Sequence, residues 1–96
     1  MDVRIQRRIV DAIPLSSSDL AIEIGPGKGA LTALLATRVE QVVAVELDPV
    51  LARQLQEIFS GKKGVEIVEG DVLSADFGEI CRRHRRESCF ILGNLP

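Results

Sequence analysis

The chain contains no tryptophan or tyrosine and only three phenylalanines, so it lacks an aromatic platform on which unpaired bases could stack. Its two cysteines, Cys81 and Cys89, lack CxxC spacing, and we expect reduced thiols with neither a disulfide nor a metal site. No apolar run approaches the roughly 18 residues that span a bilayer, and the first residues do not read as a secretory signal. A net charge of −2 does not by itself predict binding to nucleic acid or membranes. Nothing in the sequence points outside the cytoplasm.

Helical and strand-like segments alternate along the 96 residues, a length that allows one small domain. This alternation predicts an α/β fold with a parallel sheet of about four strands and helices on both faces. Asp48 followed by Pro49 predicts a capped helix start. We expect helices at 3–13, 30–38, 50–59 and 76–86, and strands at 20–24, 41–47, 65–68 and 89–92. The first helix is expected to bury Val3, Ile5, Ile9, Val10 and Ile13, and the third Leu51, Leu55, Ile58 and Phe59.

A glycine-rich turn follows the first predicted strand, at Glu23-Ile24-Gly25-Pro26-Gly27-Lys28-Gly29. Glycines at alternate positions let the backbone turn sharply and let a ligand approach the main chain. A phosphate-binding GxxxxGK[ST] loop is excluded because Gly29 follows Lys28. Three interpretations remain: a dinucleotide fingerprint through Gly25, Gly27 and Ala30, the ExGxGxG loop of methyltransferases, and a turn that merely needs glycine.

Two carboxylates mark the ends of the next two predicted strands, Glu46 at the end of the second strand and Asp71 just after the third. Glu46 lies 21 residues beyond Gly25, a spacing typical of an acid that accepts the hydroxyls of a ribose. Asp71, in Gly70-Asp71-Val72, is placed to accept a hydrogen bond from an adenine amine, while the Val72 N–H reaches a ring nitrogen. These residues indicate an adenosine-containing ligand without separating NAD from S-adenosylmethionine.

The chain ends in Asn94-Leu95-Pro96. The amine of adenine is a poor nucleophile, and two fixed acceptors on its N–H groups favour the geometry needed for attack on a methyl group. The Asn94 Oδ1 and the Leu95 carbonyl suit this role, and Pro96 restricts Leu95 to extended backbone angles. The alternative is an ordinary Asn-x-Pro turn after a strand.

Together these motifs resemble the ribosomal RNA adenine N6-dimethyltransferases, which include the KsgA-like dimethyladenosine transferases and the macrolide-resistance methyltransferases. The resemblance implies a Rossmann-like methyltransferase fold, S-adenosylmethionine as cofactor, no metal, and N6-methylation, in two steps, of adenosines in small-subunit ribosomal RNA. The matching segments are EIGPGKGALT at 23–32, VVAVELDPVLARQL at 42–55, VEGDVL at 68–73 and ILGNLP at 91–96. The implied cofactor residues are Glu23, Gly25, Gly27, Gly29, Glu46, Leu47, Asp71, Val72 and Asn94, and the implied catalytic residues are Asn94, Leu95 and Pro96.

The resemblance also implies that residues 1–96 are the front part of a larger domain. The family has an aromatic residue after the proline, a Gly-Gln-x-Phe-Leu segment ahead of the first helix, and a helical second domain, all missing here. We therefore expect weak cofactor binding and no methyl transfer by these 96 residues alone. An uncovered last strand would also favour a non-native dimer.

Two further interpretations stay open. An NAD-dependent oxidoreductase half-domain would explain the glycine turn and Glu46 but gives Asn94-Leu95-Pro96 no role, and a third possibility is a non-catalytic nucleotide-binding module. The basic run at 82–86, Arg-Arg-His-Arg-Arg, is typical of either an RNA phosphate patch or a solvated helix end. The positive charge is confined to this run and is offset by acids elsewhere in the chain, which favours the solvated helix end.

Overall fold

The computed structural model describes residues 3–71, 77–84 and 89–93, and it has the eight predicted elements in the predicted order. Within these residues no helix is long and apolar enough to cross a membrane. The second helix stops three residues before its predicted end, and the other boundaries that fall on described residues agree closely. The elements are α1 (Val3–Ala12), β1 (Leu20–Ile24), α2 (Ala30–Leu35), β2 (Gln41–Glu46), α3 (Pro49–Ile58), β3 (Val65–Glu69), α4 (Phe77–Arg83) and β4 (Cys89–Gly93).

The four strands form one parallel sheet in the order β3-β2-β1-β4. Pairing places Ile24 beside Val45 on one side and Gly93 on the other, and Glu46 beside Glu69. The carboxyl ends of all four strands therefore meet at one edge, where α/β sheets bind their ligands.

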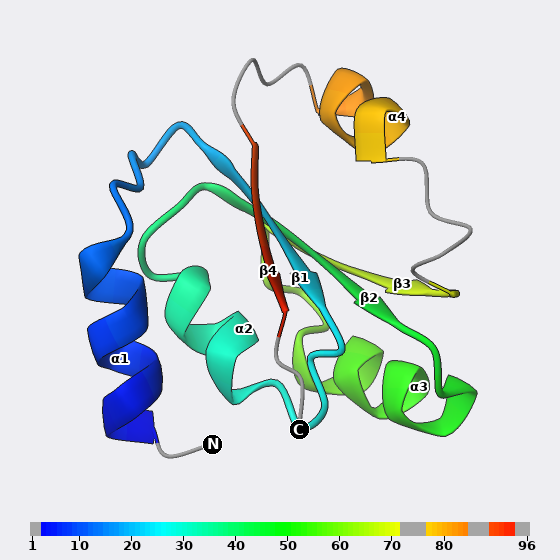
Figure 1. Cartoon of the computed structure of the whole chain (residues 1–96). Coiled ribbons are helices and arrows are strands. Elements are labelled where there is room, and N and C mark those ends of the chain that lie inside the picture. The colour runs from blue at the N-terminus through cyan, green and yellow to red at the C-terminus, as the bar shows by residue number, and fades with distance from the viewer. Residues whose placement is uncertain (1–2, 72–76, 85–88, 94–96) are drawn as a thin grey trace.

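Helices cover both faces of the sheet, as predicted (Figure 1). One apolar cluster joins Val10 of α1 and Leu35 of α2 to Ala21 and Val42 of the sheet, and α3 packs on the same side, against β2 and β3. The opposite cluster joins Ile22 and Val43 to Ile80 of α4. The central strands β1 and β2 are thus buried between two layers, and this explains their near-continuous apolar sequences.

The predicted buried faces of two helices are partly wrong. From Arg4 to Ala12 of α1, the buried positions are Gln6 and Val10, whereas Ile5 and Ile9 are 51% and 44% exposed. In α3 Ala52, Leu55 and Phe59 form the buried stripe, and Ile58 is 64% exposed. Ile58 projects about 90° away from the centre of that stripe, at about 100° of rotation per residue.

The expectation of two free thiols is also wrong, because Cys81 and Cys89 form a disulfide in this structure. Their Cα atoms lie 6.7 Å apart, a separation that a disulfide can bridge. On the face of the sheet that α4 covers, the carboxylate of Glu66 in β3 forms a 2.6 Å ion pair with Arg83 and lies 3.3 Å from His84 Nε2. These links hold α4 against the sheet.

The strand β4 lies at the outer end of the described sheet, and its Ile91 side chain is 52% exposed. Such an edge can pair with a second copy of the chain. We expect the average mass in light scattering to rise with concentration, and Ile91→Lys to suppress that rise because an edge lysine opposes pairing. Ile58→Lys, on exposed α3 surface, is the control. A monomer at every concentration would contradict this expectation.

Candidate functional site

A hollow of about 90 Å³ lies at the carboxyl edge of the sheet. It joins the ends of β1, β2 and β3, and so it brings together Gly25, Glu46, Leu47 and Asp71, four of the residues assigned to the cofactor from sequence. Glu46 and Asp71 line the same hollow and do not lie at opposite ends of the sheet. The described lining residues are Ile24, Gly25, Val45, Glu46, Leu47, Gly70 and Asp71.

The glycine turn requires glycine at three positions. Gly25, Gly27 and Gly29 have φ angles of +70°, +58° and +89°, which side chains other than glycine adopt at a cost. The Gly25 N–H donates to the Val45 carbonyl at 3.0 Å, and the Gly29 N–H donates to the Pro26 carbonyl at 2.9 Å. The turn is thereby fixed to β2 and leads directly into α2.

Gly27 and Gly29 serve different purposes. A Cβ atom on Gly29 would lie 2.9 Å from Leu55 Cδ2 and 3.1 Å from Phe59 Cε2, so this glycine lets the start of α2 pack against α3. A Cβ on Gly27 would meet nothing within 4 Å. Gly27 therefore faces open space, while Gly29 closes the packing behind it.

Glu46 connects three segments of the site. Its Oε1 accepts a hydrogen bond from the Gly27 N–H at 3.3 Å, and its Oε2 accepts one from the Asp48 N–H at 3.0 Å. Its main-chain carbonyl accepts from the Gly70 N–H at 2.9 Å. A carboxylate has further lone pairs, so Glu46 can still accept hydroxyl hydrogens from a sugar.

The turn after Glu46 begins α3 as the sequence predicted. Asp48 Oδ1 accepts hydrogen bonds from the Val50 N–H at 2.8 Å and the Leu51 N–H at 3.4 Å, and Pro49 occupies the first turn. This cap fixes the exit of the chain from β2. It therefore also fixes Leu47, whose exposed side chain forms an apolar wall of the hollow.

Glu23 does not line the described hollow; it lies buried beneath the glycine turn. The Thr32 hydroxyl of α2 donates a hydrogen bond to its Oε1, and its Oε2 has no partner among the described residues. Burial raises the pKa of Glu23 to about 7; the Thr32 hydrogen bond opposes this shift and the nearby Glu46 carboxylate adds to it. The role of Thr32 was missed from the sequence, where its position on the apolar side of a helix was the only signal.

Four candidate residues, Val72, Asn94, Leu95 and Pro96, lie outside the described residues. The last described residue of β4, Gly93, pairs with Ile24 just before the glycine turn. In the basic run, Arg82 pairs with Glu79 at 3.1 Å and Arg83 with Glu66 at 2.6 Å. These two cations are neutralised by acids, which favours the interpretation as a solvated helix end.

The parallel sheet, the glycine turn and the acids after the next two strands define a Rossmann-like methyltransferase domain, and solved methyltransferases share this fold. The 23S rRNA methyltransferase ErmE aligns with 100% of this chain at a TM-score of 0.81 and 34% identity, and this chain covers 36% of it. A dimethyladenosine transferase from Plasmodium falciparum aligns over 99% of the chain at a TM-score of 0.76 and 25% identity, and 32% of it is covered.

All of residues 1–96 match the family model described as ribosomal RNA adenine dimethylase, and the chain belongs to this family. Ribosomal RNA small subunit methyltransferase A of Acidobacterium capsulatum is 43% identical over 90 residues, which are 94% of this chain and 31% of that protein. The Pelotomaculum thermopropionicum protein of the same name is 45% identical over 104 residues, covering 100% of this chain and 35% of the relative. The chain thus spans about a third of the length of these relatives.

Gly29→Ala should lower the free energy of unfolding by about 2–5 kcal/mol. The left-handed backbone costs about 1–2 kcal/mol, and the contact with Leu55 and Phe59 adds about 1–3 kcal/mol. Gly27→Ala, whose Cβ atom meets only open space, should lower the free energy of unfolding by the backbone cost alone, about 1–2 kcal/mol. Urea denaturation measures both values, and equal losses would show that packing against α3 does not constrain Gly29.

Glu23 should make stability depend on pH. The pKa of Glu23 in the folded chain is raised to about 7, so between about pH 4.5 and pH 7 the folded chain keeps a proton that the unfolded chain has lost. The free energy of unfolding should therefore fall by about 3 kcal/mol as the pH rises through this range. Glu23→Gln should remove this decrease and be the more stable form above pH 7. Denaturation at pH 5 and pH 8 measures the effect, with exposed Glu57→Gln as control; a native-like pH dependence in Glu23→Gln would contradict it.

Proposed function

We propose that this chain is the S-adenosylmethionine-binding part of an enzyme that dimethylates the N6 of adenosines in small-subunit ribosomal RNA. The observation that carries the proposal is the shared hollow of the glycine turn, Glu46 and Asp71, in a chain of the ribosomal RNA adenine dimethylase family. The relatives' name, ribosomal RNA small subunit methyltransferase A, supports the substrate class.

The chemistry of the hollow fits an adenosine group. In this proposal Glu46 accepts the ribose hydroxyls, Leu47 packs on the sugar and base, and Asp71 accepts a hydrogen bond from the adenine amine, with the Val72 N–H on a ring nitrogen. Gly25 and Gly27 admit the rest of the cofactor to the main chain. When bound, S-adenosylmethionine supplies a methyl group activated by its sulfonium.

The target adenine is proposed to bind where the chain leaves β4. Asn94 Oδ1 and the Leu95 carbonyl accept the two N–H groups of the target amine, and Pro96 orients Leu95. These acceptors favour a nitrogen that gains positive charge during attack. No strongly basic side chain is needed for this step.

The remainder of the enzyme is proposed to lie in the two thirds of the relatives that this chain does not match. There we place the rest of the catalytic domain and a helical second domain, which complete the site for the small ribosomal subunit in the cytoplasm. The 96 residues alone are proposed to bind cofactor weakly and to transfer no methyl group. Methylation of ribosomal RNA by the isolated chain would contradict that.

Isothermal titration with S-adenosylhomocysteine and with NAD tests the cofactor. We expect S-adenosylhomocysteine to bind and NAD to give no heat. Glu46→Gln should weaken S-adenosylhomocysteine binding at least tenfold. Both oxygens of the Glu46 carboxylate accept a main-chain N–H, and in the variant the amide NH₂ group would face one of these donors, so that hydrogen bond would be lost and the turn beside the hollow would shift.

The matched control is Glu57→Gln, an exposed acid of α3 outside the hollow, and it should bind like the unchanged chain. Preferential NAD binding would favour the oxidoreductase alternative. Binding of neither ligand would favour a module without a working cofactor site.

A further inference from the structure

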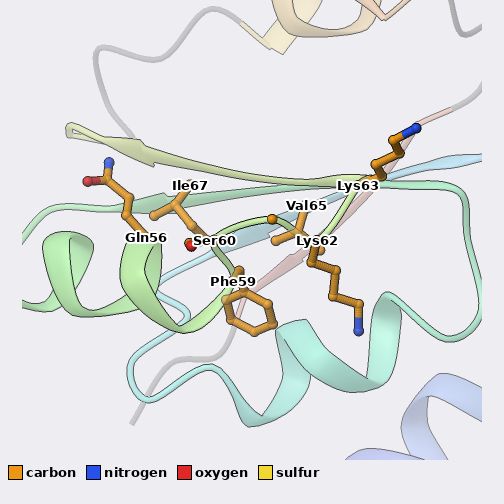
Figure 2. A pocket seen from close by; sticks show the side chains of 8 residues that line it. Gln56, Phe59, Ser60, Lys62, Lys63, Val65 and Ile67 are labelled. Atoms are coloured by element: carbon orange, nitrogen blue, oxygen red, sulfur yellow. The ribbon is translucent and has the colours of Figure 1, made fainter.

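A second hollow, of about 420 Å³, lies away from the methyltransferase site (Figure 2). It is bounded by the end of α3, the following turn and the beginning of β3. The proposed cofactor hollow begins beyond the other end of β3, where Gly70 lies ~10 Å from Ile67 at ~3.3 Å per residue. The described lining residues are Gln56, Phe59, Ser60, Gly61, Lys62, Lys63, Val65 and Ile67.

The hollow combines an apolar floor with polar groups. Val65 and Ile67 are two residues apart in β3, so both lie on the face that α3 covers, and the buried ring of Phe59 lies next to them (Figure 2). Gln56 and Ser60 add an amide and a hydroxyl from α3 and its end. Such a surface suits a flat, partly apolar group that also carries hydrogen-bonding edges.

The charge at the hollow is positive only. Lys62 and Lys63 are exposed, they form no ion pair with the described residues, and no described lining residue is acidic. Figure 2 shows their side chains leaving the turn in different directions, so the two ammonium groups lie apart from each other at the turn end of the hollow. By contrast, Arg82 and Arg83 are paired with carboxylates.

We propose that this hollow binds one unpaired nucleotide of an RNA strand, with the base on Val65 and Ile67 and the adjoining phosphates on Lys62 and Lys63. A base can pack on the two aliphatic side chains and form a hydrogen bond with the Gln56 amide, and its adjoining phosphates match the two separated charges. An acidic peptide would satisfy the lysines but would leave the apolar floor unused. The proposal rests on ribosomal RNA being the substrate, and it assigns the hollow to an RNA segment other than the methylated adenosine.

Fluorescence anisotropy with a labelled RNA single strand of about ten nucleotides tests the proposal. The double variant Lys62→Gln/Lys63→Gln should bind at least tenfold more weakly. The slope of log K against log salt should fall by about 1.4, since each phosphate contact in a single strand contributes about 0.7. Ser60→Phe, which fills the hollow without changing charge, should also weaken binding, by about fivefold.

The matched control is Arg7→Gln/Arg8→Gln, which removes the same charge from the exposed side of α1 and should change affinity less than twofold. Equal losses in both double variants, no effect of Ser60→Phe, or no binding by the unchanged chain would each overturn the proposal. Displacement of the RNA by polyglutamate at equal concentration would assign the hollow to an acidic protein instead and would also overturn it.

Each protein is titrated with S-adenosylhomocysteine in parallel. Retained cofactor binding with RNA affinity insensitive to Lys62 and Lys63 would reject only the RNA hollow. If the unchanged chain does not bind S-adenosylhomocysteine, the proposed function is rejected, whatever the RNA result.

Discussion

The site depends on the carboxylate of Glu46, which accepts one hydrogen bond from the glycine turn and one from the start of the next loop. Both donors are main-chain N–H groups, so the interaction fixes backbone and not merely side chains. The main-chain carbonyl of Glu46 also accepts a hydrogen bond from the Gly70 N–H, which fixes the end of β3. Three strand ends are therefore held together by one residue, and a ligand need not order them itself, which lowers the entropic cost of binding.

The local signals in the sequence were sufficient for the fold. Short apolar runs predicted β1 and β2 because strands buried on both faces need few polar residues. Asp48-Pro49 predicted the start of α3 because its cap is made by neighbouring residues. The pairing of the glycine turn with Glu46 followed from chain order, since parallel strands end at a common edge. These features depend on residues close in sequence or on topology alone.

Features that depend on how elements rotate and approach could not be predicted in this way. Ile58 is apolar and next to the buried stripe, yet the rotation of α3 leaves it exposed. The proximity of Cys81 and Cys89 depends on how closely α4 and β4 approach each other in space. The hydrogen bond from Thr32 to Glu23 could not be predicted without knowing that the start of α2 places Thr32 beside the carboxylate of β1.

The position of β1 between β2 and β4 has a consequence for biosynthesis. Pairing of β1 with β2 and of β2 with β3 involves consecutive segments of the chain, which can dock as they leave the ribosome. The partner on the other side of β1 is β4, which follows two further strands in the chain, and closing so long a loop is slow. The nascent protein therefore presents one open side of its central strand until β4 is made, and a chaperone would be most useful during that interval.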